Sequence, residues 1–216
     1  MHLLIVGSTG ATGQELVRQA LAQGHAVTAF VRDPARLKMT HPALRHVIGD
    51  VMDGASVDAA MPGHEAVLCA LGNFPEGKAD ADRRQRKVPV CSVGTGHIAA
   101  AMARHGLRRL VVESSASVGE SRSTGRFGAG FVLRLLLGDV MADKDRQDEV
   151  LQRSALDWTL VRPPKLNNRP AKGRLQSGEG LAWSLASSAS RADVAAFMLG
   201  ALNDATTIRR ALTVRD

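Results

Sequence analysis

The sequence predicts an α/β fold, in which a mostly parallel sheet carries helices on both faces. Short apolar segments alternate with segments of helical spacing from the N-terminus onwards, and several apolar segments contain no polar interruption. The length of 216 residues suits one domain with its own core, and no linker or internal repeat divides the chain. We therefore expect a single domain over residues 1–216.

The first half of the chain gives the clearest elements. Apolar segments predict strands over residues 2–6, 26–31, 44–48, 66–71 and 109–113. Helical spacing predicts helices over residues 12–23, 56–61 and 90–105, and Gly24 and Gly106 end two of them. Asp33 followed by Pro34 is typical of a capped helical turn. The polar and charged residues 72–87 predict a loop.

The second half contains more loop signals. Residues 114–130 hold five serines and four glycines, and residues 173–180 are also rich in glycine, so both predict loops. Residues 132–137 are apolar except for Arg134. Helices are predicted over residues 142–153 and 190–202, with Ser190 as the N-cap of the second. A strand is predicted over residues 158–161, and a last edge strand over residues 211–214.

Charge and composition limit the partners of the chain. The net charge is +7, but aromatic residues make up only 3% and tyrosine is absent. Single-stranded nucleic acid is usually bound by stacking aromatics, so we expect no nucleic acid, and an anionic small molecule remains an alternative to a solvated basic surface. No apolar run approaches the ~20 residues of a membrane span, and no signal peptide is visible. We expect a cytoplasmic protein with no membrane contact and no metal.

The predicted N-terminal strand is followed at once by the turn GSTGATG at residues 7–13. Three glycines permit a tight turn and let the backbone approach a pyrophosphate, and the helix start that follows favours an anion. A turn that only packs a helix on a strand is the alternative, but the position after the first strand favours a dinucleotide site. The residues expected at the phosphates are Gly7, Thr9, Gly10, Ala11, Thr12 and Gly13.

The end of the second predicted strand favours NADPH over NADH. Arg32 follows this strand and is placed to bind a ribose 2′-phosphate through charge-assisted hydrogen bonds. Arg36, one helical turn further on, either assists or lies on a solvated helix face. Asp33 can bind a ribose hydroxyl instead, but Pro34 after it favours a capping role.

Several further segments belong with the glycine turn: residues 31–33, 49–51, 71–72 and 114–115 and the run LDWTLVRPP at 156–164. Together with residues 7–13, they resemble the corresponding segments of the atypical short-chain dehydrogenase/reductases. The branch of biliverdin-IXβ reductase and flavin reductase, which is related to the NmrA-like proteins, is most similar. The resemblance implies a Rossmann-type domain with NAD(P) along the C-terminal edge of the sheet and a small substrate-side portion near the C-terminus.

The resemblance also implies positions along the cofactor. It puts Asp50 and Val51 by the adenine, Leu71 and Gly72 along the cofactor path, Ser114 and Ser115 beside the nicotinamide, and Pro163, Pro164 and Lys165 in the substrate-side wall. Ser115 is the first candidate to orient the substrate or the carboxamide. An ordinary strand-end hydroxyl bonded to backbone is the alternative, and it suits Ser114 better.

The chain departs from the family at the proton donor. The wider family uses Tyr-x-x-x-Lys, but Val140 stands at the tyrosine position, and Lys144 stands at the lysine position. Lys144 either holds the nicotinamide ribose or forms a helix pair with Asp148. Lys165 stands where related reductases carry histidine, and it can attract a substrate carboxylate or phosphate.

Two functions fit this pattern. The first is an NADPH-dependent reductase that passes a hydride to a conjugated small molecule, such as a flavin, a quinone-like acceptor or a tetrapyrrole. Such acceptors can take their proton from water, whereas a simple ketone needs the missing tyrosine more. The second is a non-catalytic, NADP-sensing regulatory or scaffold protein. An epimerase or dehydratase is disfavoured because it also needs the tyrosine. We expect a small-molecule substrate and a monomer or weak dimer.

Overall fold

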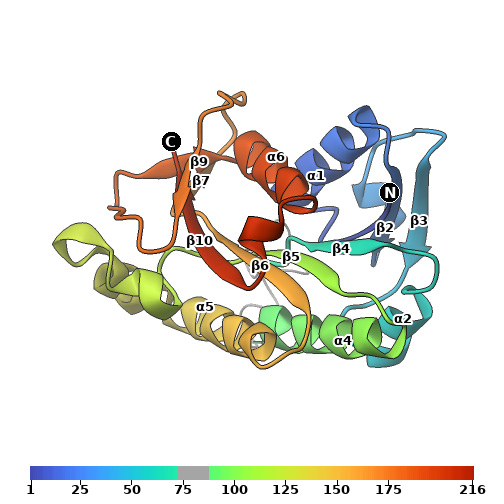
Figure 1. Cartoon of the computed structure of the whole chain (residues 1–216), viewed down its shortest axis with the longest axis horizontal. Coiled ribbons are helices and arrows are strands. Elements are labelled where there is room, and N and C mark those ends of the chain that lie inside the picture. Colours follow the sequence, from blue (N-terminus) through green and yellow to red (C-terminus); the bar gives the residue numbers. More distant parts are fainter. Residues whose placement is uncertain (73–87) are drawn as a thin grey trace.

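The computed structural model describes residues 1–72 and 88–216 of the chain. An eight-stranded sheet of order β3-β2-β1-β4-β5-β6-β10-β8 forms its centre (Figure 1). The strands are β1 (His2–Val6), β2 (Ala26–Val31), β3 (Leu44–Ile48), β4 (Ala66–Cys69), β5 (Arg109–Glu113), β6 (Asp157–Arg162), β8 (Gln176–Gly178) and β10 (Arg210–Arg215). Neighbouring strands are parallel except β10 and β8, which confirms the mostly parallel sheet.

The order of the sheet reverses beside β1. From β1 the chain passes outwards to β2 and β3, and it then returns to place β4 on the other side of β1. Leu4 pairs in register with Thr28 of β2 and with Val67 of β4. In open parallel sheets, ligands bind outside the carboxyl ends of the strands at such a reversal. This edge therefore positions the candidate site.

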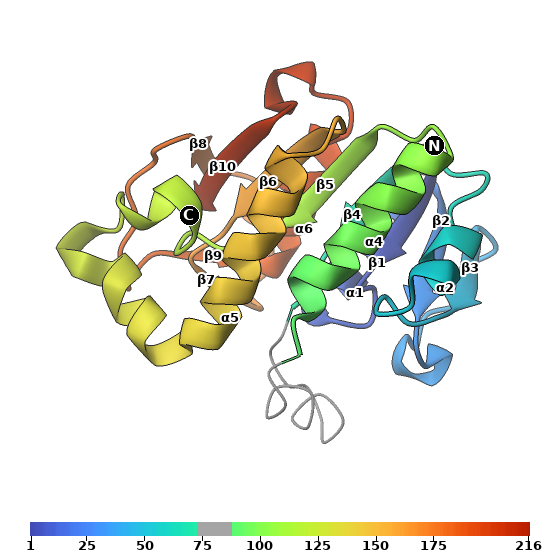
Figure 2. The same cartoon turned by 90° about the horizontal axis from the view of Figure 1, so that it is seen from below.

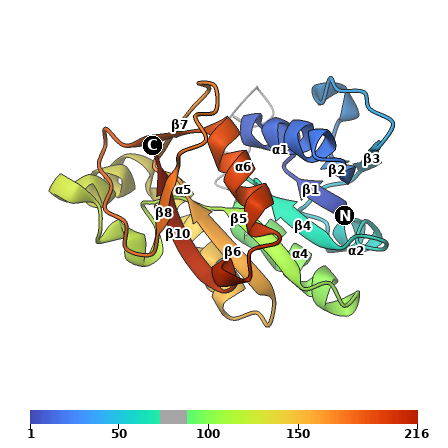
Figure 3. The same cartoon turned by 45° about the horizontal axis from the view of Figure 1, so that its top comes forward.

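Helices cover both faces of the sheet, as the sequence predicts. α1 (Ala11–Ala22) and α6 (Arg191–Ala201) pack against each other on one face, and Figure 3 shows them side by side. α2 (Gly54–Ala59), α4 (Val90–Arg104) and α5 (Ala129–Gln152) cover the other face, where α4 and α5 run next to each other (Figure 2). The result is a single α/β domain of three layers.

The central strands are apolar throughout because both of their faces are buried. In β1, Leu3 and Ile5 belong to the same core cluster as Leu16 of α1. Leu4 and Val6 belong instead to the cluster on the other face, which includes residues of α4. Alternate residues of a strand point to opposite faces, so this strand requires apolar side chains at consecutive positions.

Residues 114–130 are more regular than the predicted loop. Two 3-10 turns at Gly119–Arg122 and Arg126–Gly128 lead into α5, which begins at Ala129. α5 then includes both the apolar segment 132–137 and the predicted helix 142–153, with non-helical backbone at Leu137 (φ −128°). The loop prediction was wrong only for residues 129 and 130, which begin α5 directly after Gly128, where φ is +70° and glycine is favoured.

The C-terminal part contains short strands that the loop signals conceal. The strand predicted over residues 211–214 is present as part of β10, but its predicted position at the edge of the sheet is wrong. β10 lies between β6 and β8, and the antiparallel β8 forms the edge. β8 itself lies within residues 173–180, where a loop is predicted. β7 (Lys165–Asn167) and β9 (Ser188–Ser190) pair in a separate parallel sheet. Strands of three residues are too short to display the period of two that identifies a strand.

Two predictions concern loops and the surface. The predicted polar loop over residues 72–87 lies outside the described residues, apart from Gly72. In the described ranges, no helix has the length and apolar character that a membrane crossing requires.

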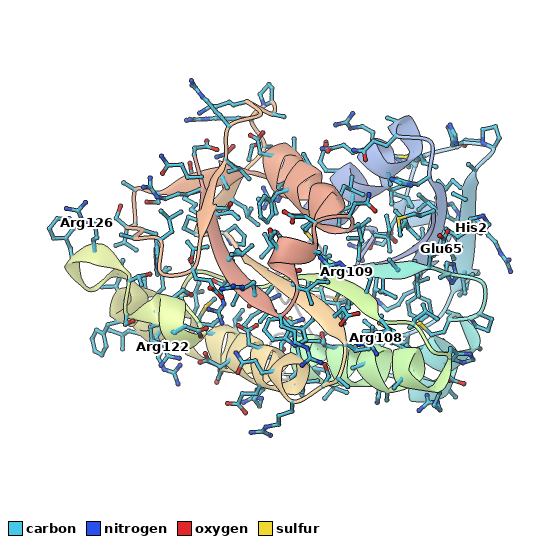
Figure 4. The ribbon with its side chains drawn as sticks, viewed as in Figure 1. His2, Glu65, Arg108, Arg109, Arg122 and Arg126 are labelled. Atoms are coloured by element: carbon cyan, nitrogen blue, oxygen red, sulfur yellow. The ribbon has the colours of Figure 1, made fainter. Side chains whose placement is uncertain are left out.

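Figure 4 shows Arg122 and Arg126 at one end of the molecule, away from Arg108 and Arg109. Arg109 donates to the carbonyl oxygen of Asp157 at 2.6 Å, which is a structural role.

Candidate dinucleotide site

A pocket of about 220 Å³ lies at the reversal of the sheet, outside the carboxyl ends of β1, β2 and β4. Among the residues predicted to bind the cofactor, those that line it are Gly7, Thr9, Gly10, Ala11, Thr12, Arg32, Arg36, Val51, Leu71 and Gly72. The fold thus brings together residues from four connections that are separated in the sequence. Gly13, Asp50, Ser114 and Pro163 are not among the lining residues, and neither are Ser115, Lys144 and Lys165, which were expected on the nicotinamide and substrate side.

The glycine turn owes its shape to close packing at two of its glycines. Gly7 has φ +83°, and a Cβ there would lie 2.5 Å from the carbonyl oxygen of Ala70. A Cβ at Gly13 would lie 2.0 Å from the carbonyl oxygen of Gly7, so only glycine lets α1 approach β1 so closely. At Gly10 the nearest atom would be 3.4 Å away. This glycine faces the open side of the turn.

The start of α1 offers free N–H groups to an anion. Gly10 caps the helix without any side-chain hydrogen bond, and no acidic residue occupies the first turn. The first N–H groups of a helix have no partner within the helix, and the helix dipole adds partial positive charge there. A pyrophosphate therefore fits this end of the pocket, which is the part that the GSTGATG turn predicts.

Arg32 and Arg36 line the end of the pocket beside β2. Between them, the side chain of Asp33 accepts a hydrogen bond of 3.0 Å from the N–H of Ala35 and caps the turn Pro34–Arg36. The capping role of Asp33 is thus confirmed. Two guanidinium groups remain at the position where a 2′-phosphate is expected.

The predicted adenine residues differ in their surroundings. Val51 is buried and lines the pocket, and a Cβ at Gly94 of α4 would come within 2.7 Å of it. The Asp50 carboxylate accepts a hydrogen bond of 3.0 Å from the N–H of Met52. Val51 therefore forms an apolar wall of the pocket, and Asp50 shapes the turn that presents it.

Lys144 is buried and braces the ends of two strands. Its ammonium group donates to the carbonyl oxygens of Leu71 and Glu113, both at 2.7 Å. The predicted helix pair with Asp148 is wrong, because the Asp148 carboxylate instead accepts from Ser114 Oγ at 2.7 Å and from Arg162 at 2.8 Å. Lys144 thus contacts backbone beneath the pocket, and its predicted contact with the nicotinamide ribose stays a prediction.

The other residues predicted on the nicotinamide and substrate side are not among the residues that line the pocket. Ser115 Oγ lies 2.9 Å from Ser117 Oγ. The hydroxyl of Ser114 bonds to a carboxylate, so the expected bond to backbone is wrong. Pro163 accepts a hydrogen bond from the N–H of Ala116 at 3.0 Å. Lys165 is exposed, whereas its neighbour Leu166 lines the pocket, because successive residues of β7 point in opposite directions.

Sequence reasoning missed two charged residues of the pocket, Glu113 and Arg191. Glu113 ends β5 with 8% of its surface exposed, and its Oε1 accepts a hydrogen bond of 3.1 Å from Thr12 Oγ1. The Thr12 hydroxyl, expected at the phosphates, thus donates to a carboxylate here. Arg191 is the first residue of α6. A charged residue directly after the apolar residues 110–112 was the available signal for Glu113.

The fold and this pocket define a protein of the dinucleotide-binding class. The sequence profile of the NAD(P)H-binding family matches residues 7–205, and the chain belongs to this family. The expected cofactor is thereby confirmed at the level of NAD(P)H.

Comparisons with known proteins agree with this assignment. An uncharacterized chloroplastic protein of Arabidopsis thaliana is 29% identical over 178 residues, which is 80% of this chain, but the chain spans only 62% of that protein. An anaerobillin reductase, ChuY of Escherichia coli O157:H7, has a TM-score of 0.80 at 20% identity and covers 99% of this chain and 96% of its own. A short-chain dehydrogenase/reductase of Veillonella parvula, solved in complex with NADP, has a TM-score of 0.79 at 18% identity, with 100% and 94% covered.

Proposed function

We propose that the chain is an NADPH-dependent reductase that transfers a hydride to a conjugated small molecule, such as a flavin, a quinone-like acceptor or a tetrapyrrole. The observation that carries this proposal is the pocket itself. The pocket contains the start of α1, where no side chain caps the first N–H groups, and two arginines at one end. The chain has no tyrosine to act as a proton donor.

The charges of the pocket support NADPH in preference to NADH. The pyrophosphate would lie at the N–H groups of α1, and the 2′-phosphate would lie against Arg32 and Arg36. Asp33, the residue that competes for a ribose hydroxyl in NADH-binding sites, is engaged as a helix cap. Arg32 and Arg36, which line the pocket, are the groups that we expect to recognise the 2′-phosphate of the ribose.

The chemistry of the acceptor follows from what the chain lacks. The bound cofactor supplies the hydride, and the protein binds and orients the reactants. A conjugated acceptor can take its proton from water, so it tolerates the valine at position 140 where the wider family has tyrosine. The similar structure named as an anaerobillin reductase favours a tetrapyrrole among the three acceptor classes.

A second candidate function is that of a non-catalytic NADP sensor or scaffold. One observation favours it: Ser115, Lys144 and Lys165, the predicted catalytic residues, do not line the described pocket. Lys144 is engaged by two carbonyl oxygens, and Lys165 is exposed. A protein that only responds to the cofactor would need no more than the dinucleotide end of this pocket.

The two candidates are separated by one experiment on the purified chain. Oxidation of NADPH is followed at the nicotinamide absorbance with FMN, a quinone and biliverdin as acceptors, and NADPH binding is titrated in parallel. Turnover that saturates with one acceptor supports the reductase, whereas tight NADPH binding without turnover supports the sensor. A reaction mixture without protein serves as the control, because reduced nicotinamides can reduce flavins and quinones directly. The cytoplasmic location and the monomeric or weakly dimeric state stay predictions.

A further inference from the structure

Glu113 is the only acidic side chain among the described residues that line the pocket. The charged side chains around it are all cationic: Arg32, Arg36 and Arg191 line the same cavity. The start of α1, with its partial positive charge, lies at the same cavity. The pocket therefore contains one carboxyl group in a site built for a ligand that carries several negative charges.

The position of Glu113 is fixed by contacts on two sides. Thr12, in the first turn of α1, donates its hydroxyl proton to Glu113 Oε1 at 3.1 Å. Lys144 of α5 holds the backbone carbonyl oxygen of Glu113 at 2.7 Å. With 8% of its surface exposed, the side chain has little freedom to turn away when an anion enters. A carboxylate fixed in this way would repel each phosphate of a dinucleotide.

Four elements place titratable or charged groups around Glu113. These are Lys144 on α5, Arg191 on α6 and Cys69 on β4, in addition to the terminus of α1. Burial raises the pKa of the Glu113 carboxyl, and this effect outweighs the opposing influence of Lys144, Thr12 and Arg191. Asp148, one turn beyond Lys144, is occupied by Ser114 and Arg162.

We propose that Glu113 takes up one proton when the dinucleotide binds, so that the pocket holds its cofactor more tightly as the pH falls. This inference rests on the cofactor binding included in the proposed function. The proton comes from solvent and adds to the carboxylate, which removes its charge without forming or breaking any other bond. The neutral carboxyl group can still accept the hydrogen bond from Thr12, so the turn keeps its support.

The sign of the effect follows from linkage. If the bound anion raises the pKa of Glu113, the complex binds more protons than the free protein at any pH between the two pKa values. The dissociation constant then rises with pH, by at most about tenfold per pH unit for one proton. Replacement of Glu113 by glutamine, which has the same shape and no titration, should remove this dependence and retain tight binding at high pH.

The test is a titration of the full chain with NADH, followed by nicotinamide fluorescence between about pH 5.5 and about pH 9. NADH is used because the 2′-phosphate of NADPH itself titrates near pH 6, as phosphate monoesters do. Wild type should show a dissociation constant that rises several-fold per pH unit, and Glu113→Gln should show a flat profile. Glu15→Gln, which changes a carboxyl on α1 that pairs with Arg18 instead, should keep the wild-type slope.

A second measurement needs no variant. Calorimetric titration of wild type in two buffers with different ionisation enthalpies counts the protons taken up per dinucleotide bound. Uptake approaching one proton in the sloping range supports the proposal, and zero uptake overturns it even where the cofactor binds well. Equal slopes in wild type and Glu113→Gln would also overturn it. Absence of dinucleotide binding at every pH would contradict the proposed function together with this inference.

Discussion

The ammonium group of Lys144 donates a hydrogen bond of 2.7 Å to the carbonyl oxygen of Leu71, and so ties α5 to the residues that follow β4. A second bond of the same length reaches the carbonyl oxygen of Glu113 at the end of β5. The lysine that the resemblance assigns to the cofactor thus also holds two strand ends of the pocket in place. Because its ammonium group bonds to both carbonyl oxygens, Lys144 has a structural role that can be tested separately from a role at the cofactor.

Lys144→Met should destabilise the protein, because it removes two charge-assisted hydrogen bonds and leaves two buried carbonyl groups without their donor. Hydrogen bonds to charged groups contribute about 1.5–3 kcal/mol each, so the loss of two is expected to cost about 3–6 kcal/mol. Denaturant unfolding of the cofactor-free protein measures it. Unchanged stability combined with weaker NADPH binding would instead assign Lys144 to the nicotinamide ribose.

Arg32→Ala should weaken NADPH and leave NADH nearly unchanged, because only NADPH carries the 2′-phosphate. A loss of about 1.5–3 kcal/mol corresponds to a dissociation constant roughly 10- to 150-fold higher. Fluorescence titration with both cofactors gives the ratio within one variant. Arg18→Ala, on the exposed face of α1, is the matched control and should change neither value. An equal loss for both cofactors would contradict the assignment.

Gly13→Ala and Gly10→Ala should differ sharply. The Cβ at position 13 would lie 2.0 Å from a backbone oxygen, so α1 has to shift, and we expect a destabilisation of at least about 1–3 kcal/mol. A Cβ at position 10 would lie 3.4 Å from its nearest neighbour, the carbonyl oxygen of Gly7, so the fold should survive. The added methyl group would instead occupy space that the pyrophosphate needs. Thermal unfolding and NADPH titration separate the two effects. Similar losses of stability in both variants would refute this distinction.

Asp193 should link stability to acid pH. Burial alone would raise the pKa of Asp193, but hydrogen bonds from the N–H groups of Lys172 and Gly173 and from the Ser190 hydroxyl outweigh it and hold this pKa below its usual value. A carboxyl with a lowered native pKa contributes stability above its unfolded pKa of about 3.9, and this contribution is lost as the pH falls through the native value.

Asp193→Asn should therefore lower the free energy of unfolding at neutral pH by about 1–3 kcal/mol and flatten its decline below about pH 4. Denaturant unfolding across this range tests it. Because Asp193 lies in the first turn of α6, directly after Arg191 and Ala192, the variant should also loosen the end of the pocket that Arg191 lines. An unchanged acid profile would show that the three hydrogen bonds do not determine this part of the pH dependence.

The dinucleotide end of the site was predictable because local rules decide it. An apolar strand, a glycine turn and a helix start follow one another within residues 2–22, and Gly7 and Gly13 serve the packing roles that this order requires. The order Asp33–Pro34 likewise predicted the capping role of Asp33 from the sequence. Each of these inferences needs only neighbours in the chain.

The opposite end was less predictable because side-chain direction there depends on contacts between distant segments. Lys144 follows the kink at Leu137, beside Gly138, but its partners are Leu71, after β4, and Glu113, at the end of β5, which both lie far away in the sequence. Lys165, expected in the substrate-side wall, is exposed, whereas Leu166 lines the pocket, because successive residues of the short strand β7 point in opposite directions. Glu113 follows the apolar residues 110–112 of β5, but its contact with Thr12 joins residues that are 101 positions apart in the sequence.

The most direct test of the cofactor site is a titration of wild type with NADPH under stoichiometric conditions, with Gly10→Ala beside it. We expect saturable binding of one NADPH per chain, and much weaker binding by the Gly10→Ala variant, which should remain folded. Absence of saturable binding by wild type, or undiminished binding by the folded Gly10→Ala variant, would contradict the claim that the pocket at the start of α1 holds the cofactor.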